Sequence, residues 1–572
     1  MKITFVSKSH LLALLAGAFS ATLHAAPPVP DAGQLLQQQP KAPVPSAAPQ
    51  APAASSPVPE GKPEKAGPSV LVKGFRIVGA TLISEQELQT QLTEHTGKTY
   101  SFEQLQIIAL RLIGYYAEQG YLARVFLAPQ DFNDGIVTFT VVEGKLGALK
   151  LDDKIDVSRI DAARVQRFLA ARLTPGAPLS MSAVGEALNI LNEQPGIEAR
   201  ASLKPGSGEG AVDLLINATA TPPTTYNTQI NNHGARGTGE LQLTGSITLN
   251  NPTGNFDAAS LLLNASEGNT YLHAGYSLAV GDNGLRVGVN ASALDYRITQ
   301  SDFTALKANG DASQIALTAS YPLARRTDFS LSLEGSVEGK RLVDRTVAGE
   351  TSNRSVTVTH LGINGYTVGG ALGSAVGSFG AGVSFGNTDQ RNATALATDS
   401  TTRQVQGGFS KFSYNLGYLR PLPRDWRFNA TLNGQFAGKN LDSSERINFG
   451  GINGVRAYPT GEATADEGWL LRIDLAKPFN DSLLTHVFLD AAGAKLNHQT
   501  WNNWNAANAG QSNTYQIAGV GAGLDWRISR DVLVSASVAS PLGNNPGADT
   551  LGKNVDGKGQ STRVWLGLNA RF

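Results

Sequence analysis

Two short motifs in this sequence could belong to an enzyme, and both fail on the residues around them. Gly382 to Gly386 reads G-x-S-x-G, the nucleophile elbow of hydrolases, which needs a turn from a strand into a helix. No helical pattern follows it, and chance explains the motif in a chain with 62 glycines. Gly547 to Lys553 resembles a phosphate-binding loop, but Asn554 replaces the Ser or Thr that would hold Mg²⁺. We therefore expect no catalytic residue.

Composition also argues against metal, cofactor and nucleic-acid chemistry. The chain has no cysteine, so thiolate metal sites and disulfides are impossible. Its eight histidines are scattered without metal-ligand spacing. Lys plus Arg and Asp plus Glu balance at 47 each, which is not the composition of a nucleic-acid-binding protein. We expect no metal, no cofactor and no nucleic acid.

One Gly-rich segment, Asn448 to Gly468, places a single arginine, Arg456, among apolar residues. Such a loop is typical of a specific functional site, but an external loop with one solvated arginine would look the same. About 30 residues later a strand alternates, with Val487, Leu489 and Ala491 on one face and His486, Phe488 and Asp490 on the other. If the first face meets lipid, Asp490 points into a barrel lumen, where an inward-folded Arg456 would find a bidentate partner.

The C-terminal segment predicts the barrel that would position these residues. Thr562 to Phe572 alternates strictly, with Val564, Leu566, Leu568, Ala570 and Phe572 on one face. A long amphipathic strand at the end of a soluble protein would leave an aggregation-prone edge, whereas a closed barrel pairs it with the first strand. The pattern therefore favours a β-barrel of a bacterial outer membrane.

The N-terminus is typical of an exported protein. Lys2 and Lys8 precede an apolar run from Leu11 to Phe19, and Leu23 to Ala25 fits a cleavage site, so residues 1–25 read as a secretory signal peptide rather than a helix of a soluble protein. Residues 26–69 are rich in Pro and Ala and predict an extended linker. Within them, Asp31 to Gln39 could form two helical turns, a possible plug helix.

Residues 70–220 contain the same order of elements twice, β-α-α-β-β. The first unit, 70–144, opens with a strand from Val70 to Ile77, and Ser84 with Glu87 predicts a capping box at its first helix. The second unit covers 145–221. Each reads as a small α+β module.

After residue 221 the helical signal disappears and alternating segments separated by turns continue to Phe572. Residues 222–572 are enough for about 16 strands at roughly 22 residues per strand and connection. A soluble sandwich of this length in one domain would be unusual. The fold class is therefore mixed, two α+β modules followed by a transmembrane antiparallel β-barrel.

Several of these segments resemble one family. The tandem modules resemble polypeptide-transport-associated (POTRA) domains. Val455, Arg456, Ala457 and Tyr458 resemble the Val-Arg-Gly-Tyr tip of an inward-folded loop in outer-membrane polypeptide-transport barrels, with Ala457 in place of Gly. Phe488 and Asp490 resemble the start of that family's Phe-x-Asp-x-Gly strand motif, with Ala492 in place of Gly. Two modules before a 16-stranded barrel is the plan of two-partner secretion transporters, the filamentous-haemagglutinin and haemolysin exporter type.

This resemblance implies a function in the outer membrane, with the modules in the periplasm. A large secreted protein, such as an adhesin or haemolysin, would bind the modules through its N-terminal domain and cross the lumen. The inward-folded loop from Asn448 to Gly468 and the N-terminal helix would occupy the resting pore. Trp565 and Phe572 resemble the C-terminal signal that hands barrels to the assembly machinery, and outer-membrane lipid would surround the strands.

Three alternatives are open from the residues alone. A diffusion porin would explain the barrel but not the modules. A barrel-assembly factor of the same superfamily would carry more modules and no Pro-rich linker. A barrel enzyme would need a convergent acid–base set, which the sequence does not offer.

Overall fold

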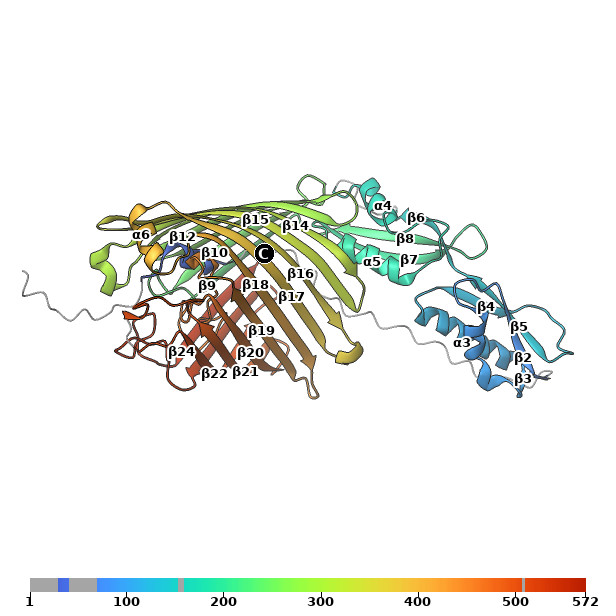
Figure 1. The fold of residues 1–572 in the computed structure, drawn as a ribbon. Helices are drawn as coiled ribbons and strands as arrows, with labels where there is room; N and C mark the ends of the chain where they lie inside the picture. The colour runs from blue at the N-terminus through green and yellow to red at the C-terminus, as the bar shows by residue number, and fades with distance from the viewer. Residues whose placement is uncertain (1–28, 41–68, 153–158, 507–509) are drawn as a thin grey trace, which may run out of the picture.

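The computed structural model describes residues 29–40, 69–152, 159–506 and 510–572. Two small modules lie at one end of a large closed barrel (Figure 1). The predicted signal peptide and most of the predicted linker lie outside the described residues. Among the described residues, no helix is long and apolar enough to cross a membrane.

The first module is a mixed three-stranded sheet with two helices. In chain order its elements are β1 (Ser69–Leu71), β2 (Gly74–Val78), α2 (Glu85–Thr90), η1 (Thr93–His95), β3 (Thr99–Ser101), α3 (Phe102–Glu118), β4 (Ala123–Leu127) and β5 (Ile136–Glu143). The central β5 runs parallel to β2 and antiparallel to β4. The buried stripe of α3, including Leu105 and Leu112, forms one core with the inner face of the sheet.

Two local predictions for this module were wrong. The strand expected from Val70 to Ile77 is split, because Val72 donates to Lys98 and Lys73 donates to Gly135, which turns β1 away to pair with β3. At α2, Ser84 caps the helix by accepting from the Glu87 amide at 3.2 Å. The Glu87 carboxylate accepts from the Tyr115 hydroxyl at 2.5 Å instead of completing a capping box.

Glu143, at the end of β5, fastens the module internally. Its carboxylate accepts from the Leu82 amide and the Tyr116 hydroxyl, each at 2.8 Å, and from Thr81. Burial alone would raise the pKa of the Glu143 carboxyl, but these hydrogen bonds outweigh it and hold the pKa below the ordinary glutamate value. Glu143 is therefore charged at neutral pH and joins the sheet, α3 and the loop after β2.

The second module repeats the plan with β6 (Lys145–Leu151), α4 (Ala162–Ala170), α5 (Met181–Asn192), β7 (Ile197–Pro205) and β8 (Ala211–Ala220). Its sheet order is β6-β8-β7, with β8 parallel to β6 and antiparallel to β7. The buried faces of α4 and α5, including Phe168 and Ile190, cover one side of this sheet.

The barrel has sixteen strands in a closed order, each paired with its sequence neighbours, and β9 pairs with β24 to close the ring. They are β9 (Thr224–Asn231), β10 (Gln242–Asn250), β11 (Ala258–Ser266), β12 (Asn269–Val280), β13 (Leu285–Arg297), β14 (Asn309–Arg325), β15 (Phe329–Thr346), β16 (Gly349–Val368), β17 (Val376–Gln390), β18 (Gly407–Pro421), β19 (Arg427–Ala437), β20 (Glu467–Pro478), β21 (Leu483–Lys495), β22 (Thr514–Arg527), β23 (Val532–Pro541) and β24 (Arg563–Arg571). The predicted antiparallel barrel of about 16 strands is confirmed.

Alternation along the strands places one face outside and one in the lumen. On β24, Val564 and Leu566 are 55% and 52% exposed, whereas Trp565 between them is 5% exposed. On β21, Val487 is exposed and Phe488 is buried. In the outer membrane, a bilayer would cover this outward-facing row of apolar side chains.

The second module is joined to the barrel through buried contacts. Phe256, in the turn between β10 and β11, is buried in the core of the module and meets the Phe168 ring edge-on at a centroid distance of 5.5 Å. Arg286 of β13 donates to the carbonyl of Phe256 at 2.8 Å and to Gln194 of the module at 2.9 Å. These contacts fix the second module against the barrel rim.

The short helix α1 (Ala32–Gln37) lies inside the barrel, as Figure 1 shows in blue among the strands. Asp31 caps it by accepting from the Gln34 amide at 2.9 Å. Ala32, Leu35 and Leu36 are buried among apolar side chains of the barrel wall, including Leu342 of β15. Six residues cannot form a stable helix in water, so this tertiary contact stabilises α1.

Candidate functional site

The site is built by the segment between β19 and β20, residues 438–466, which we call the lid loop. It includes the short helix η4 (Ser443–Glu445). Phe449, Val455 and Ala465 of the loop are buried against Ile517 and other lumen-facing side chains of the wall. The loop therefore folds into the lumen and fills part of it.

Glycines allow the tip to turn back on itself. A Cβ on Gly454 would lie 2.2 Å from the carbonyl oxygen of Phe449, and a Cβ on Gly450 would lie 2.3 Å from that of Pro459. Both distances are too short for any side chain. The tight turn presents residues 455–458 to the wall of β20 and β21.

Arg456 is held at the tip by two carboxylates. Its Nε and Nη2 donate to Asp490 at 2.8 and 2.7 Å, and its Nη1 and Nη2 donate to Asp474 at 2.8 and 3.2 Å. Its backbone amide donates to Asp490 at 3.0 Å. Arg456 is 4% exposed and Asp490 is 0% exposed. Paired bidentate bonds of this kind are among the strongest polar contacts in proteins.

Phe488 completes the seat of Arg456. The guanidinium carbon of Arg456 lies 3.5 Å from the centroid of the Phe488 ring, in cation–π contact. Arg472 of β20 lies 3.7 Å from Asp490, so two arginines face two carboxylates. The charges balance, which lowers the cost of burying them.

The other predicted tip residues are also buried at this seat. Ala457 is 1% exposed, and an added Cβ on Gly519 of β22 would lie 2.4 Å from its methyl group. The methyl group of Ala457 therefore fits against the wall because residue 519 is a glycine without a side chain. Val455 and Tyr458 are 0% exposed, and the Tyr458 hydroxyl has no hydrogen-bond partner among the described residues.

The lid loop also holds α1. Arg354 of β16 lies at the centre of three carboxylates: Nη1 contacts Asp344 at 2.7 Å, Nη2 contacts Asp31 at 3.1 Å and Nε contacts Asp442 at 2.5 Å. Asp344 accepts from the Ala32 amide at the start of α1 at 2.8 Å. Ser443 of the loop donates to Asp31 at 2.7 Å. Helix, loop and wall thus share one buried charged cluster.

A second charged cluster fixes the base of the loop. Glu445 of η4 lies 2.5 Å from Lys340 of β15 and 2.9 Å from Lys411 of β18. Lys340 also lies 3.0 Å from Glu338. The lumen contents are therefore tied to the wall by ion pairs as well as by apolar packing, and water can replace the ion pairs when the segment leaves.

Several of these residues carried no recognisable sequence signal. Arg472 and Asp474 are inward-facing residues of a strand with an ordinary alternating pattern. Arg354 and Asp442 are far apart in the chain. Asp474 lies 16 residues before Asp490 on the neighbouring strand, so a search for a second inward carboxylate beside Asp490 could have found it. The partners of α1 depend on the closed barrel and could not have been found that way.

The two residues of the predicted C-terminal signal, Trp565 and Phe572, lie in different environments. Trp565 faces the lumen, and its Nε1–H donates to the backbone carbonyl of Arg456 at 2.7 Å. Phe572 is 71% exposed on the outer row, and its backbone exchanges two hydrogen bonds with Tyr226 at 2.9 and 3.0 Å. Trp565 thus belongs to the seat of the lid loop, a role that sequence reasoning missed.

Across the described part of the chain, His, Asp and Glu side chains form no group of three or more that could hold a metal ion. The acidic residues at the tip are already engaged by arginines. The arrangement is suited to closing a lumen by a removable polar contact.

Comparisons with known proteins give family matches for two parts of the chain. Residues 210–526 match the family described as haemolysin secretion/activation protein ShlB/FhaC/HecB, and residues 70–144 match the POTRA domain of ShlB type.

Individual relatives match over most of their length. The chain is 27% identical to the heme/hemopexin transporter protein HuxB of Haemophilus influenzae (strain 86-028NP), over 80% of this chain and 81% of that protein. It is 24% identical to the outer membrane transporter CdiB of Dickeya dadantii (strain 3937), over 72% of each. Its fold is similar to the solved structure of CdiB from Escherichia coli, with a TM-score of 0.66, 21% identity and coverage of 90% of this chain and 93% of that one.

Proposed function

The chain belongs to the family of haemolysin secretion/activation proteins ShlB/FhaC/HecB, and we propose that its resting pore is closed by a removable plug made of the lid loop and α1. It is an outer-membrane transporter of the two-partner secretion type, with its POTRA modules in the periplasm. The family exports large partner proteins. The proposal concerns how the closed barrel lets such a client through.

The observation that carries the proposal is the chemistry of the plug's contacts. Arg456, Arg354 and Lys340 join the plug to the wall through buried ion pairs. Apolar contacts bury part of the plug, but the charged residues that join it to the wall are buried pairs, which give little net stability. Ionic contacts can be exchanged for water or for a polar client, so the plug can leave and return.

In this proposal the modules choose the client and the barrel does not. The two sheets end in the strands β2, β4, β6 and β7, each with a sheet neighbour on one side in the strand order. An extended segment from the N-terminal secretion domain of the client could add to such an edge as a further strand. The domain division at 70–144, 145–221 and 222–572 follows this separation of roles.

A domain exchange tests this assignment. When residues 70–220 replace the corresponding modules of a related transporter, the hybrid should secrete the client of this chain. The converse hybrid, with foreign modules on this barrel, should secrete the foreign client. The readout is the amount of each client in the medium, with the unexchanged transporters as controls. If both hybrids keep the client that matches their barrel, the modules do not choose it.

The C-terminus supports a second part of the proposal, delivery to the barrel-assembly machinery. Deleting Phe572 removes one exposed apolar side chain, worth about 1.5–3 kcal/mol when lipid covers it, and two backbone bonds to Tyr226. This is small against a closed barrel. We therefore expect a low outer-membrane level of the deletion variant at low expression, but nearly normal heat resistance of the inserted molecules on unheated gels. Equal membrane levels with and without Phe572 would show that the terminus is only structural.

A further inference from the structure

The junction where the barrel closes has the fewest register pairs in the wall. The strands β9 and β24 have five register pairs, from Gly567 and Asn231 to Arg571 and Asn227, and Phe572 adds one more. The next-shortest ladders, β9–β10, β10–β11 and β23–β24, have eight, and β15–β16 has eighteen. We call the β9–β24 junction the seam.

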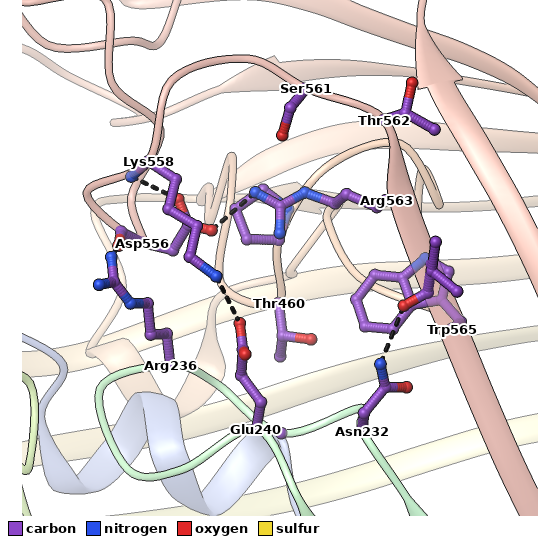
Figure 2. A pocket seen from close by; sticks show the side chains of 13 residues that line it. Asn232, Arg236, Glu240, Thr460, Asp556, Lys558, Ser561, Thr562, Arg563 and Trp565 are labelled. Atoms are coloured by element: carbon purple, nitrogen blue, oxygen red, sulfur yellow. Dashed lines mark hydrogen bonds and ion pairs between the residues drawn. The ribbon is translucent and has the colours of Figure 1, made fainter.

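Above the five pairs, the backbone amide of Asn232 donates to the carbonyl of Leu566 at 3.2 Å, and the Asn232 side chain adds two further bonds to β24. The Asn232 side-chain amide donates to the carbonyl of Val564 at 2.9 Å, and its Oδ1 accepts from the Leu566 amide at 2.7 Å. The side chain thus acts as a peptide group where β9 has ended. Figure 2 shows Asn232 reaching across to β24 and draws the bond that its side-chain amide donates.

Beyond Asn232 the two strands separate around a cavity of about 180 Å³. Its lining includes Asn232, Thr460, Thr562, Arg563 and Trp565 (Figure 2). The contacts on its far side join two loops: the Lys558 side chain lies 3.4 Å from that of Glu240, and the Arg236 side chain donates to the backbone carbonyl of Asp556 at 2.7 Å. The Lys558–Glu240 pair is half exposed, so it adds little to the closure.

The lid loop bridges this seam from the lumen side. Trp565 of β24 donates to the carbonyl of Arg456, and Thr460 donates from Oγ1 to the carbonyl of His233, which follows β9, at 2.9 Å. The His233 and Trp565 rings meet edge-on across the seam, with centroids 5.8 Å apart. One loop tip therefore binds both sides of the shortest ladder in the barrel.

We propose that the lid loop is a latch on the seam, with Trp565 and Thr460 as the positioning residues that couple the seat of Arg456 to closure of the wall. While the loop is seated, parting β9 from β24 must also break at least one of its two bonds. When the loop leaves, the seam keeps its short ladder and the Asn232 side chain, and it is the part of the wall that loosens first. A client that displaces the loop thereby also makes the wall more compliant where the lumen must widen.

The coupling works in both directions, as any linkage between two states must. Loosening the loop loosens the seam, and locking the seam holds the loop. The inference rests on the proposed function in one respect, that the lid loop leaves its seat. The coupling itself can be measured without any client, so its failure is distinguishable from failure of the proposed plug.

Amide hydrogen exchange on the inserted full chain tests the coupling. Trp565→Phe keeps the ring and removes the Nε1–H donor, and Thr460→Val removes the hydroxyl. Each should speed exchange of the amides in residues 226–231 and 566–571 about fivefold, the effect of losing one buried hydrogen bond. The long β15–β16 ladder should exchange as before, and Thr398→Val, at an external hydroxyl of α6 (Ala393–Thr401), should leave the seam unchanged. Unchanged seam exchange in both latch variants would overturn the proposal.

A cross-link tests whether the loosening matters for transport. Gln229 and Asn569 are register partners across the seam. In an antiparallel ladder, hydrogen-bonded and non-hydrogen-bonded residue pairs alternate. Since Tyr226 and Phe572 form a hydrogen-bonded pair, Gln229 and Asn569, three positions along, form a non-hydrogen-bonded pair. The Cα atoms of such a pair lie about 4.5 Å apart, which suits a disulfide. The chain has no cysteine of its own, so Gln229→Cys with Asn569→Cys forms a defined bridge.

The oxidised seam variant should lose at least nine-tenths of its secretion, counted per cross-linked molecule, and regain it on reduction. The control pair, Ala274→Cys with Ala291→Cys in the longer β12–β13 ladder, should secrete normally in both states. Normal secretion by the oxidised seam variant would show that the seam stays shut during transport.

Discussion

Replacing Arg456 by alanine should reduce secretion of the client at least tenfold while the barrel still inserts. The change removes the partner of Asp490, which is 0% exposed, and of Asp474. Leaving a buried carboxylate without its partner costs about 3–5 kcal/mol, so the tip loses its single seat. A loop without a fixed seat occupies many positions in the lumen, including those that the client must use. The resting ion conductance of the purified protein in planar bilayers should rise as well.

Companion variants separate charge from geometry. Arg456→Lys keeps the charge but not the bidentate bonds to both carboxylates, so it should secrete at an intermediate level. Asp490→Asn combined with Arg456→Ala should be less harmful than Arg456→Ala alone, because no uncompensated charge remains on β21. Arg341→Ala, at an exposed arginine of β15, is the matched control. Wild-type secretion by Arg456→Ala at normal membrane levels would contradict the role of this seat.

Replacing Gly33 by leucine should open the resting pore. A Cβ at Gly33 would lie 2.4 Å from Ser443 Oγ and 2.7 Å from the Ser444 amide nitrogen, so a larger side chain cannot fit between α1 and the lid loop. The helix has only six residues and depends on this contact. We expect a several-fold higher conductance in planar bilayers, and greater sensitivity of cells to antibiotics that the outer membrane normally excludes.

The matched control for this variant places the same side chain at a glycine with free space around it. A Cβ on Gly339 of β15 would meet no atom within 4 Å, so Gly339→Leu adds a leucine without entering the contact between α1 and the lid loop. This variant should conduct like the wild type. If both variants conduct alike, the helix does not close the pore.

The architecture followed from the sequence where a single period described a whole element. Strict alternation from Val564 to Phe572 gave the register of the last strand, and the same rule placed Asp490 inward and Val487 outward. The two modules were recognisable because helix and strand periods alternate in the same order twice. The split of the first strand could not be recognised from the sequence, because it depends on bonds from Val72 and Lys73 to distant loops.

The contents of the lumen were less predictable for the same physical reason. The contact between Arg456 and Asp490 could be predicted, because alternation along the strand placed Asp490 in the lumen and the tip of the loop contained a single arginine. The seat of α1 combines Asp31, Arg354 and Asp442, which are brought together only when the barrel closes. Trp565 shows the limit most clearly: in the sequence it is part of a terminal aromatic pattern, whereas its indole donor supports the loop tip.

Tethering α1 to the wall tests the central claim, that a plug must leave the pore before the client passes. Gln39, just after α1, accepts from Asn264 of β11 at 3.0 Å. Gln39→Cys with Asn264→Cys can be bridged by a short reagent that reacts with two thiols through cleavable disulfides. The bridged transporter should stop secreting, and reduction should restore secretion. Each single-cysteine variant treated with the reagent should secrete normally. Undiminished secretion by fully bridged molecules would contradict the account, because the client would then cross a lumen in which the helix still lies.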